Sequence, residues 1–233
     1  MRESEVNTDM TRANWEEIHQ SNVGHDCGWH LEGLPDQTVA LLETPRVIKD
    51  RALDLGCGAG HHSILLGQFF STVVGVDFAE SGVRRAVAAV GSGNPAPHFF
   101  VGDATALPFP DDSFDFILDR GCLLTIPVDQ WPDYFRNIER VMKTGAYYQV
   151  FYRKGGWPDR PYRHWQRPGR GRRSALRRFL SKARRLTMSR PPPPPLKLDC
   201  FPPTFECETT ESVPFISASG AQVEYTHIIC RKT

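Results

Sequence analysis

Long apolar runs are missing from the sequence. No window of its 233 residues approaches the ~18 consecutive apolar residues that a membrane-spanning helix needs. The opening stretch, MRESEVNTDM, lacks the apolar core of a secretory signal, and its acidic residues are untypical of a mitochondrial presequence. From these absences we expect a soluble, cytoplasmic protein with no membrane span.

Cysteine is present, but not at the spacings of metal or dithiol sites. No two of the six cysteines form a CxxC pair, and none stands at a zinc-like distance from histidine. We therefore expect reduced thiols in a cytosolic setting and no bound metal. The six are Cys27, Cys57, Cys122, Cys200, Cys207 and Cys230.

Acidic residues are missing from one segment. Thirteen of the 28 Lys and Arg residues, and none of the 27 Asp and Glu residues, lie between Arg160 and Lys197. The rest of the chain therefore has 15 basic against 27 acidic residues, so a basic segment is attached to an acidic body. Within it, apolar residues at helical spacing and the prolines at 191–195 predict one basic helix flanked by flexible or polyproline segments.

From residue 51 onward, short apolar strands alternate with helical stretches. This alternation predicts an α/β fold with a doubly wound, mostly parallel, Rossmann-like sheet of seven strands and helices on both faces. The last two strands have no helix between them, so we expect an antiparallel C-terminal edge. Strands are predicted over 52–55, 72–77, 97–103, 114–119, 146–152, 205–215 and 223–232, and helices over 8–20, 36–43, 60–70, 79–90 and 128–142.

These patterns divide the chain into four parts. We predict an N-terminal helical cap over the cofactor site at 1–50, an α/β core at 51–152, a basic insertion at 153–198 and a C-terminal β-hairpin at 199–233. The insertion is open to three interpretations: a solvated loop, a lid over the acceptor site, or an arm that binds nucleic acid or an acidic membrane face.

The stretch RALDLGCGAGHHS, residues 51–63, leads an apolar strand into a glycine-rich turn and then a helix. A dinucleotide-binding GxGxxG turn would have its third glycine at position 61, where this chain has His61. The spacing here is DxGxGxG, beginning at Asp54. That carboxylate can attract an ammonium group while the turn presents backbone N–H groups to a carboxylate. The pattern favours a zwitterionic ligand, and a tight turn without a ligand is the alternative.

Acidic residues also end the next three strands. Asp77 closes VVGVD, and an acidic residue there can accept hydrogen bonds from both hydroxyls of a ribose. Asp103, beside Ala104 in GDATALPF, can accept from an exocyclic amine such as that of adenine. Asp119 and Arg120 follow the fourth strand, beside the cleft where the strand order is expected to reverse. The tips together predict a nucleoside-binding edge.

With the motifs LDLGCGAG, VVGVDFAE, GDATALPF and FDFILDRG, residues 45–152 resemble the class I S-adenosylmethionine-dependent methyltransferases. The W…GWH…P entrance and the DRGC stretch resemble more particularly the thiopurine and tellurite-resistance branch. The resemblance implies that Trp15 or Trp29 covers the cofactor. The cofactor-binding residues that it implies are Trp29, Asp54, Gly56, Gly58, Gly60, Asp77, Phe78, Asp103, Ala104 and Asp119.

The chain departs from the resembled family at MKTGAYY, where a Lys-Pro-Gly-Gly turn is common, and in the basic insertion. Both departures concern the acceptor side. A sulfonium methyl group needs only alignment at roughly 3–3.5 Å and exclusion of water, whereas a hydroxyl or protonated amine acceptor also needs a base. The predicted catalytic residues are Asp119, as base, and Arg120, which either orients an anionic acceptor or pairs with Asp119. His30, His61 and His62 are the alternative bases.

We therefore predict a monomeric methyltransferase that transfers a methyl group from S-adenosylmethionine to a small-molecule acceptor by in-line displacement. A thiol or other soft nucleophile is the narrower expectation. One alternative is a natural-product O- or N-methyltransferase. Another is a cofactor-binding module whose basic arm, residues 160–197, docks RNA or a protein partner. An NAD-dependent oxidoreductase is the weakest contender, because position 61 is not glycine.

Overall fold

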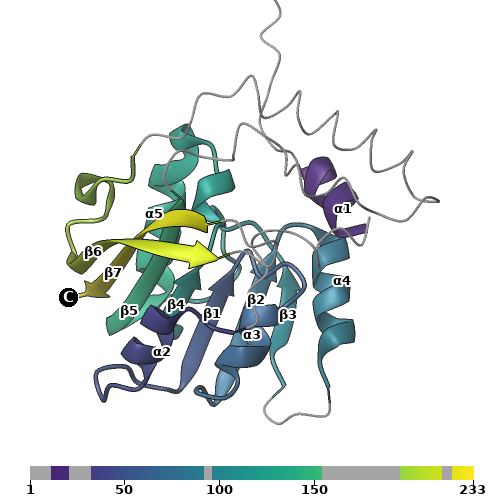
Figure 1. Ribbon diagram of the computed structural model, residues 1–233, viewed down its shortest axis with the longest axis horizontal. Coiled ribbons are helices and arrows are strands. Elements are labelled where there is room, and N and C mark those ends of the chain that lie inside the picture. The colour runs from purple at the N-terminus through teal and green to yellow at the C-terminus, as the bar shows by residue number, and fades with distance from the viewer. Residues whose placement is uncertain (1–11, 21–32, 92–95, 154–194, 217–221) are drawn as a thin grey trace, which may run out of the picture.

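The computed structural model describes residues 12–20, 33–91, 96–153, 195–216 and 222–233 (Figure 1). The strands are β1 (Arg51–Leu55), β2 (Thr72–Asp77), β3 (His98–Val101), β4 (Phe114–Asp119), β5 (Met142–Arg153), β6 (Phe205–Ile216) and β7 (Gln222–Lys232). The α-helices are α1 (Arg12–Gln20), α2 (Asp36–Leu42), α3 (His61–Leu66), α4 (Glu80–Ala89) and α5 (Trp131–Val141), and the short 3-10 helices are η2 (Leu123–Thr125), η3 (Val128–Gln130) and η5 (Leu198–Cys200).

All seven strands form one sheet in the order β3-β2-β1-β4-β5-β7-β6. The first five in this order are parallel neighbours, whereas β7 pairs antiparallel with both β5 and β6. The order reverses between β1 and β4, which is where ligands bind in sheets of this type. The predicted fold, including the antiparallel edge, is confirmed.

Two apolar clusters cover the two faces of the sheet. Helix α5 packs Tyr134, Phe135 and Ile138 into one cluster, together with Leu53 and Ile117 of the strands. The opposite cluster combines α2 and the end of α3 with alternate strand residues; it contains Leu42, Leu66, Ala52, Phe116, Leu118 and Phe151. Strand β4 is buried along its whole length because both of its faces are covered, and its residues other than Asp115 and the terminal Asp119 are apolar.

The predicted helix over 128–142 is shorter than expected. Residues 128–130 form η3, and α5 begins at Trp131 with a proline in its first turn. The helix passes directly into β5 at Met142, so β5 begins four residues before the predicted strand. A register shift between Phe114 and Phe116 accommodates this early start, and Gly145 adopts a positive φ of 82° nearby. Periodicity alone did not reveal this junction.

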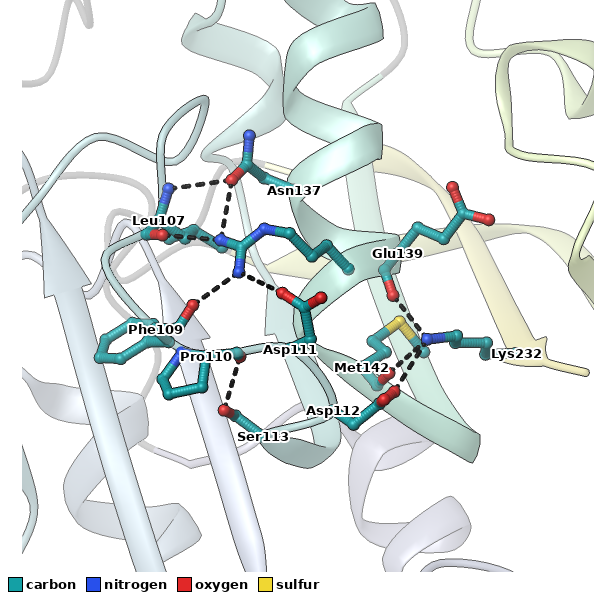
Figure 2. A network of polar contacts seen from close by, with 11 residues as sticks. Leu107, Phe109, Pro110, Asp111, Asp112, Ser113, Asn137, Glu139, Met142 and Lys232 are labelled. Carbon is teal, nitrogen blue, oxygen red and sulfur yellow. Dashed lines mark hydrogen bonds and ion pairs between the residues drawn. The ribbon is translucent and has the colours of Figure 1, made fainter.

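A polar network holds the loop between β3 and β4 against α5 (Figure 2). Arg140 of α5 donates to the carbonyl oxygens of Leu107 at 2.8 Å and Phe109 at 2.6 Å, and to Asp111 at 2.9 Å. Lys232 of β7 donates to the carbonyl oxygens of Glu139 and Met142, where a cation complements the carboxyl end of the helix. The loop that carries Asp103 and Ala104 is thereby tied to the sheet.

Cys207 and Cys230 lie directly opposite one another in β6 and β7 and form a disulfide bond. The expectation that all six thiols are reduced is therefore wrong for this pair. Sequence spacing could not reveal it, because the two residues are 23 positions apart and meet only through the antiparallel register. Cys57, Cys122 and Cys200 are free in the described part of the chain.

Several sequence predictions fall outside the described residues. These are the placement of Trp29 and His30 and almost all of the basic insertion at 153–198. In the part that is described, no helix is both long and apolar enough to cross a membrane. The core at 51–152 and the hairpin at 199–233 contribute strands to the same sheet.

Candidate functional site

The glycine-rich turn after β1 lies at the carboxyl edge of the sheet. Gly56, Gly58 and Gly60 have positive φ values of 67°, 52° and 80°, a region that side chains other than glycine rarely adopt. A Cβ added to Gly56 would lie 2.9 Å from the Cβ of Cys122, so the turn is also sterically restricted to glycine there. The N–H groups of Gly56 and Cys57 both donate to the carbonyl oxygen of Val76, which fixes the turn against β2.

Asp77 connects this turn to the beginning of α4. Its two carboxylate oxygens accept the N–H of Gly58 at 2.9 Å and the N–H of Ala79 at 2.8 Å. The side chain is buried, and burial raises its pKa. Because each carboxylate oxygen can accept more than one hydrogen bond, Asp77 retains capacity for ligand hydroxyls.

Asp54 and Asp119 are also buried at this edge. The hydroxyl of Ser63 donates to Asp54 at 2.6 Å, and burial raises the pKa of Asp54 to about 7. Asp119 accepts the N–H groups of Cys122 at 2.7 Å and Leu123 at 2.9 Å, as well as the hydroxyl of Tyr134. Burial raises the pKa of Asp119 to about 6 despite these donors.

The acidic side chains converge around Cys122. Burial raises the pKa of the Cys122 thiol well above its usual value, and the negative charges of Asp119, Asp77, Asp103 and Asp54 raise it further. The thiol is therefore neutral and packs against the core instead of acting as a nucleophile. Three of these carboxylates, those of Asp54, Asp77 and Asp119, are buried, and buried carboxylates at one edge of the sheet favour a ligand that brings positive charge.

Asp103, Ala104 and Phe78 stand at the same edge as the first two acidic tips. Asp103 accepts the N–H of Thr105 at 2.8 Å and its hydroxyl at 2.7 Å, which shapes the loop after β3. Ala104 packs against the α5 side of the core. Phe78 lies under the guanidinium of Arg12, whose Cζ is 5.8 Å from the ring centroid.

Helix α1 lies above the beginning of α4, at the edge where the parallel strands end (Figure 1). The carboxylate of Glu16 accepts the N–H groups of Glu80 at 2.6 Å and Ser81 at 2.9 Å, so it caps α4 from outside. The buried ring of His19 lies 3.3 Å from the position a Cβ of Gly58 would take. Trp15, the predicted cofactor cover, has its ring centroid 6.2 Å from that of His19.

Glu16 and His19 were not predicted as site residues. Glu16 contacts Glu80 and Ser81, and His19 lies against Gly58; these partners are distant in the chain, and short motifs carry no signal for such contacts. Burial is the main cause that lowers the pKa of His19, and the charge of Asp77 partly opposes that shift.

Arg120 directly follows β4, which is separated from β2 by β1 in the sheet. Its guanidinium carbon is 5.9 Å from the ring centroid of Tyr225 on β7. Burial lowers the pKa of Arg120, and the nearby charges of Tyr225 and Asp54 act in the opposite direction. His61 and His62 open α3, with ring centroids 5.6 Å apart. The described residues contain no cluster of three His, Cys, Asp or Glu side chains placed to hold a metal.

Residues 52–145 match a protein family described as a methyltransferase domain. The chain is 33% identical over 107 residues to an eEF1A lysine and N-terminal methyltransferase homolog of Drosophila melanogaster, covering 42% of this chain and 16% of that protein. It is 36% identical over 126 residues to demethylmenaquinone methyltransferase of Roseiflexus castenholzii, covering 53% of this chain and 48% of that protein. The chain thus spans less than half the length of these two relatives.

The fold is similar to that of a SAM-dependent methyltransferase from Anabaena variabilis, with a TM-score of 0.63 at 15% identity over the whole of both chains. The matched domain and this fold imply S-adenosylmethionine as the cofactor. The residues present fit it, because the buried carboxylates beside the glycine turn suit its sulfonium and ammonium charges.

Proposed function

We propose that this protein transfers a methyl group from S-adenosylmethionine to a small-molecule acceptor, and the match of residues 52–145 to a methyltransferase-domain family supports the proposal. The observation that carries the proposal is that Asp54, Asp77 and Asp119 lie buried at the ends of adjacent parallel strands beside the glycine turn, where Asp77 accepts the N–H of Gly58. When bound, the cofactor supplies a methyl group on positively charged sulfur, which an acceptor lone pair displaces to leave S-adenosylhomocysteine. No protein nucleophile is needed.

We propose that the chain's own residues divide the binding work. Asp54 and the glycine turn, with Gly56, Gly58 and Gly60, hold the ammonium and carboxylate of the methionine end. Asp77 binds the ribose while it keeps Gly58 in place, and Phe78, Asp103 and Ala104 surround the adenine. Helix α1 covers this end with Trp15 and His19.

In this proposal Asp119 is not the catalytic base that the sequence predicts but a residue that stabilises a turn. Its side chain is fully buried, and its oxygens accept hydrogen bonds from two backbone N–H groups and the hydroxyl of Tyr134. We propose that it holds the turn between β4 and η2, and thereby Cys122 against Gly56. Arg120 remains the candidate to contact the acceptor, because its guanidinium lies beside Tyr225 at the far side of the edge.

A protein or RNA acceptor is the second candidate. One relative's printed name is that of an eEF1A lysine and N-terminal methyltransferase homolog, which supports a protein acceptor. The thirteen basic residues between Arg160 and Lys197 support an RNA acceptor. A labelled-cofactor screen that offers thiols, phenols, amines, bulk RNA and protein extract separates these classes by which product carries the label.

The cofactor assignment is tested by calorimetry with S-adenosylmethionine, S-adenosylhomocysteine and NAD. We expect binding of the first two and none of the third. Asp77→Asn should weaken binding by more than about 1.5 kcal/mol, because charge-assisted hydrogen bonds to the ribose are lost. The exposed Asp129→Asn, in η3, serves as the matched control. Equal affinities of Asp77→Asn and wild type would refute the ribose placement, and no binding of either sulfur compound would refute the function.

A further inference from the structure

Tyr134 of α5 and Tyr148 of β5 form a buried pair of hydroxyl groups beside the end of β4. Their hydroxyl oxygens are 2.9 Å apart, and the Tyr134 hydroxyl also bonds to the carboxylate of Asp119. All three residues are 0% exposed, and both tyrosines belong to the apolar cluster that includes α5. A buried hydroxyl is costly unless it is hydrogen-bonded, and phenylalanine would fill nearly the same volume without that cost. What the two hydroxyls contribute is therefore their contact with Asp119.

The sheet register brings these three side chains to one face. Asp119, the last residue of β4, is paired with Val150 of β5. Tyr148 precedes Val150 by two residues, so its side chain points to the same face of the sheet. Helix α5 packs on this face and places the Tyr134 hydroxyl between the other two groups. The contact depends on strand register and helix packing together.

The ionised form of Asp119 determines the direction of these hydrogen bonds. A carboxylate has no proton to donate, so the Tyr134 hydroxyl donates to Asp119. The oxygen of Tyr134 is then left to accept the hydroxyl proton of Tyr148. Hydrogen bonds in a chain polarise one another, and a hydrogen bond to a charged group is stronger than a neutral one. The two tyrosines therefore stabilise a carboxylate inside the core.

On its other side, Asp119 holds the turn that follows β4. Its oxygens accept the N–H groups of Cys122 at 2.7 Å and Leu123 at 2.9 Å. Cys122 in turn lies against the glycine turn, because a Cβ added to Gly56 would be 2.9 Å from the Cβ of Cys122. A protonated carboxyl group is a weaker acceptor for two N–H donors than a carboxylate. Loss of the charge on Asp119 therefore loosens Cys122 and its support of Gly56.

The groups around Asp119 act on its ionisation in opposite directions. Burial raises its pKa to about 6, whereas the Tyr134 hydroxyl and the backbone N–H groups of residues 121–123 lower it. The charge of Asp119 also contributes to the raised pKa of Asp54, and burial raises the pKa of Tyr134 and Tyr148, which stay neutral. Asp119 is thus ionised at pH 7 by a margin of only about one pH unit. Removal of one hydrogen bond is enough to reverse this balance.

We propose that Tyr134 and Tyr148 are positioning residues of the cofactor site: their linked hydroxyls orient Asp119, which holds Cys122 against the glycine turn at Gly56. In this role they contact neither cofactor nor acceptor and act only through Asp119. The inference depends on the proposed function, because this turn is the proposed binding site for the methionine end of S-adenosylmethionine. It follows that cofactor affinity depends on the ionisation of a carboxylate buried under α5.

The first test follows the Asp119 carboxyl carbon of wild-type protein by NMR during a pH titration, with the resonance assigned through bonds from the Asp119 backbone. Binding that needs the ionised carboxylate must favour that form in return. At about ten times its Kd, S-adenosylhomocysteine should therefore lower the titration midpoint by about half a pH unit or more. An unchanged midpoint would overturn the inference without any variant having to fold. If the nucleoside does not bind wild type, the proposed function itself fails.

The second test measures S-adenosylhomocysteine affinity by calorimetry at pH 7 and pH 9, with each variant compared with wild type at the same pH. Tyr134→Phe keeps the ring but removes the donor to Asp119. Its affinity should be about fivefold weaker than wild type at pH 7 and within about twofold at pH 9, where Asp119 is ionised without that donor. Tyr148→Phe leaves the bond from Tyr134 to Asp119 in place and should show a smaller loss in the same direction.

Tyr147→Phe is the matched control, because it removes a hydroxyl from a buried tyrosine of β5 that belongs to the cluster on the opposite face of the sheet. It should bind like wild type at both pH values. Normal binding by Tyr134→Phe at pH 7 would show that its hydroxyl does not position the site. An equal loss at pH 7 and pH 9 would show a general structural defect instead. Either result removes this inference and leaves the proposed function in place, provided that wild type binds the nucleoside.

Discussion

Asp54 is a buried carboxyl group, and burial makes its ionised form unfavourable. Its pKa of about 7, raised by burial and by the charges of Asp119 and Asp77, means that much of the population is protonated near neutral pH. An unfolded chain ionises this group near 3.8, so the stability contributed by protonated Asp54 is lost as the pH rises toward 7. The proposed ligand reverses this balance, because its ammonium group favours the carboxylate.

Cofactor binding should therefore depend on pH through Asp54. Only the ionised carboxylate pairs with the ammonium, so we expect affinity for S-adenosylhomocysteine to be about tenfold weaker at pH 6 than at pH 8. Calorimetry across this range, with release of protons measured in buffers of different ionisation enthalpy, checks the expectation. Asp54→Asn should bind weakly at pH 8 and lose most of the pH dependence. Affinity that is constant from pH 6 to pH 8 would contradict the role of Asp54.

Among single residues, sequence reasoning succeeded where a short motif reports a strand end. It placed Asp54 and Asp77 at the edge because apolar strands lead directly into them, and the structure has both there. It could not show that Asp119 faces inward to Tyr134, because that contact depends on how α5 packs on the sheet. It also could not show that Gln149 and His227 meet, because the two residues lie on different strands far apart in the chain.

At the scale of elements, α1 and α4 meet through Glu16. The backbone N–H groups that begin a helix have no partner inside that helix, and α4 has no side-chain cap of its own. Glu16 fills this role from a helix more than sixty residues earlier in the chain, and the same contact places His19 beside Gly58. The same helix, α1, therefore both caps α4 and lies over the glycine turn.

Glu16→Ala should loosen α1 from α4 and thereby weaken cofactor binding. A helix cap contributes about 1 kcal/mol, so we expect affinity for S-adenosylhomocysteine to fall about fivefold. Calorimetry measures the affinity, and Gln20→Ala, at an exposed position of the same helix, is the control. Unchanged affinity in Glu16→Ala would show that α1 does not cover the site. A comparable loss in Gln20→Ala would show that the effect does not come from the cap.

The element boundaries show where local pattern is insufficient. The strands β2 and β4 occupy the predicted residues because both are short, apolar and bounded by polar turns. Strand β5 begins earlier than predicted because Met142 is buried by its neighbours in the sheet, although Lys143 and Gly145 are not strand-like in sequence. Tertiary contacts decided that boundary, and a single sequence does not display them.

At the scale of the whole molecule, the antiparallel hairpin of β6 and β7 completes the edge at which the acceptor is proposed to bind. Strand β7 supplies Tyr225, which lies beside Arg120, and it lies between β5 and β6. The disulfide between Cys207 and Cys230 joins the two hairpin strands near the carboxyl end of β7. The stability of this hairpin therefore bears on the acceptor site without any contact between the disulfide and a ligand.

The disulfide should stabilise the fold, because it restricts the unfolded chain across a separation of 23 residues. Loop-closure entropy of this size corresponds to about 3 kcal/mol. Urea unfolding of wild type with and without a reductant should show this difference, whereas Cys207→Ala should unfold identically in both conditions. Titration of thiols in denaturant, without reductant, should find two fewer than the six that the sequence contains. Six titratable thiols would show that the bond does not form, and an equal response of Cys207→Ala to the reductant would place the redox effect at another cysteine.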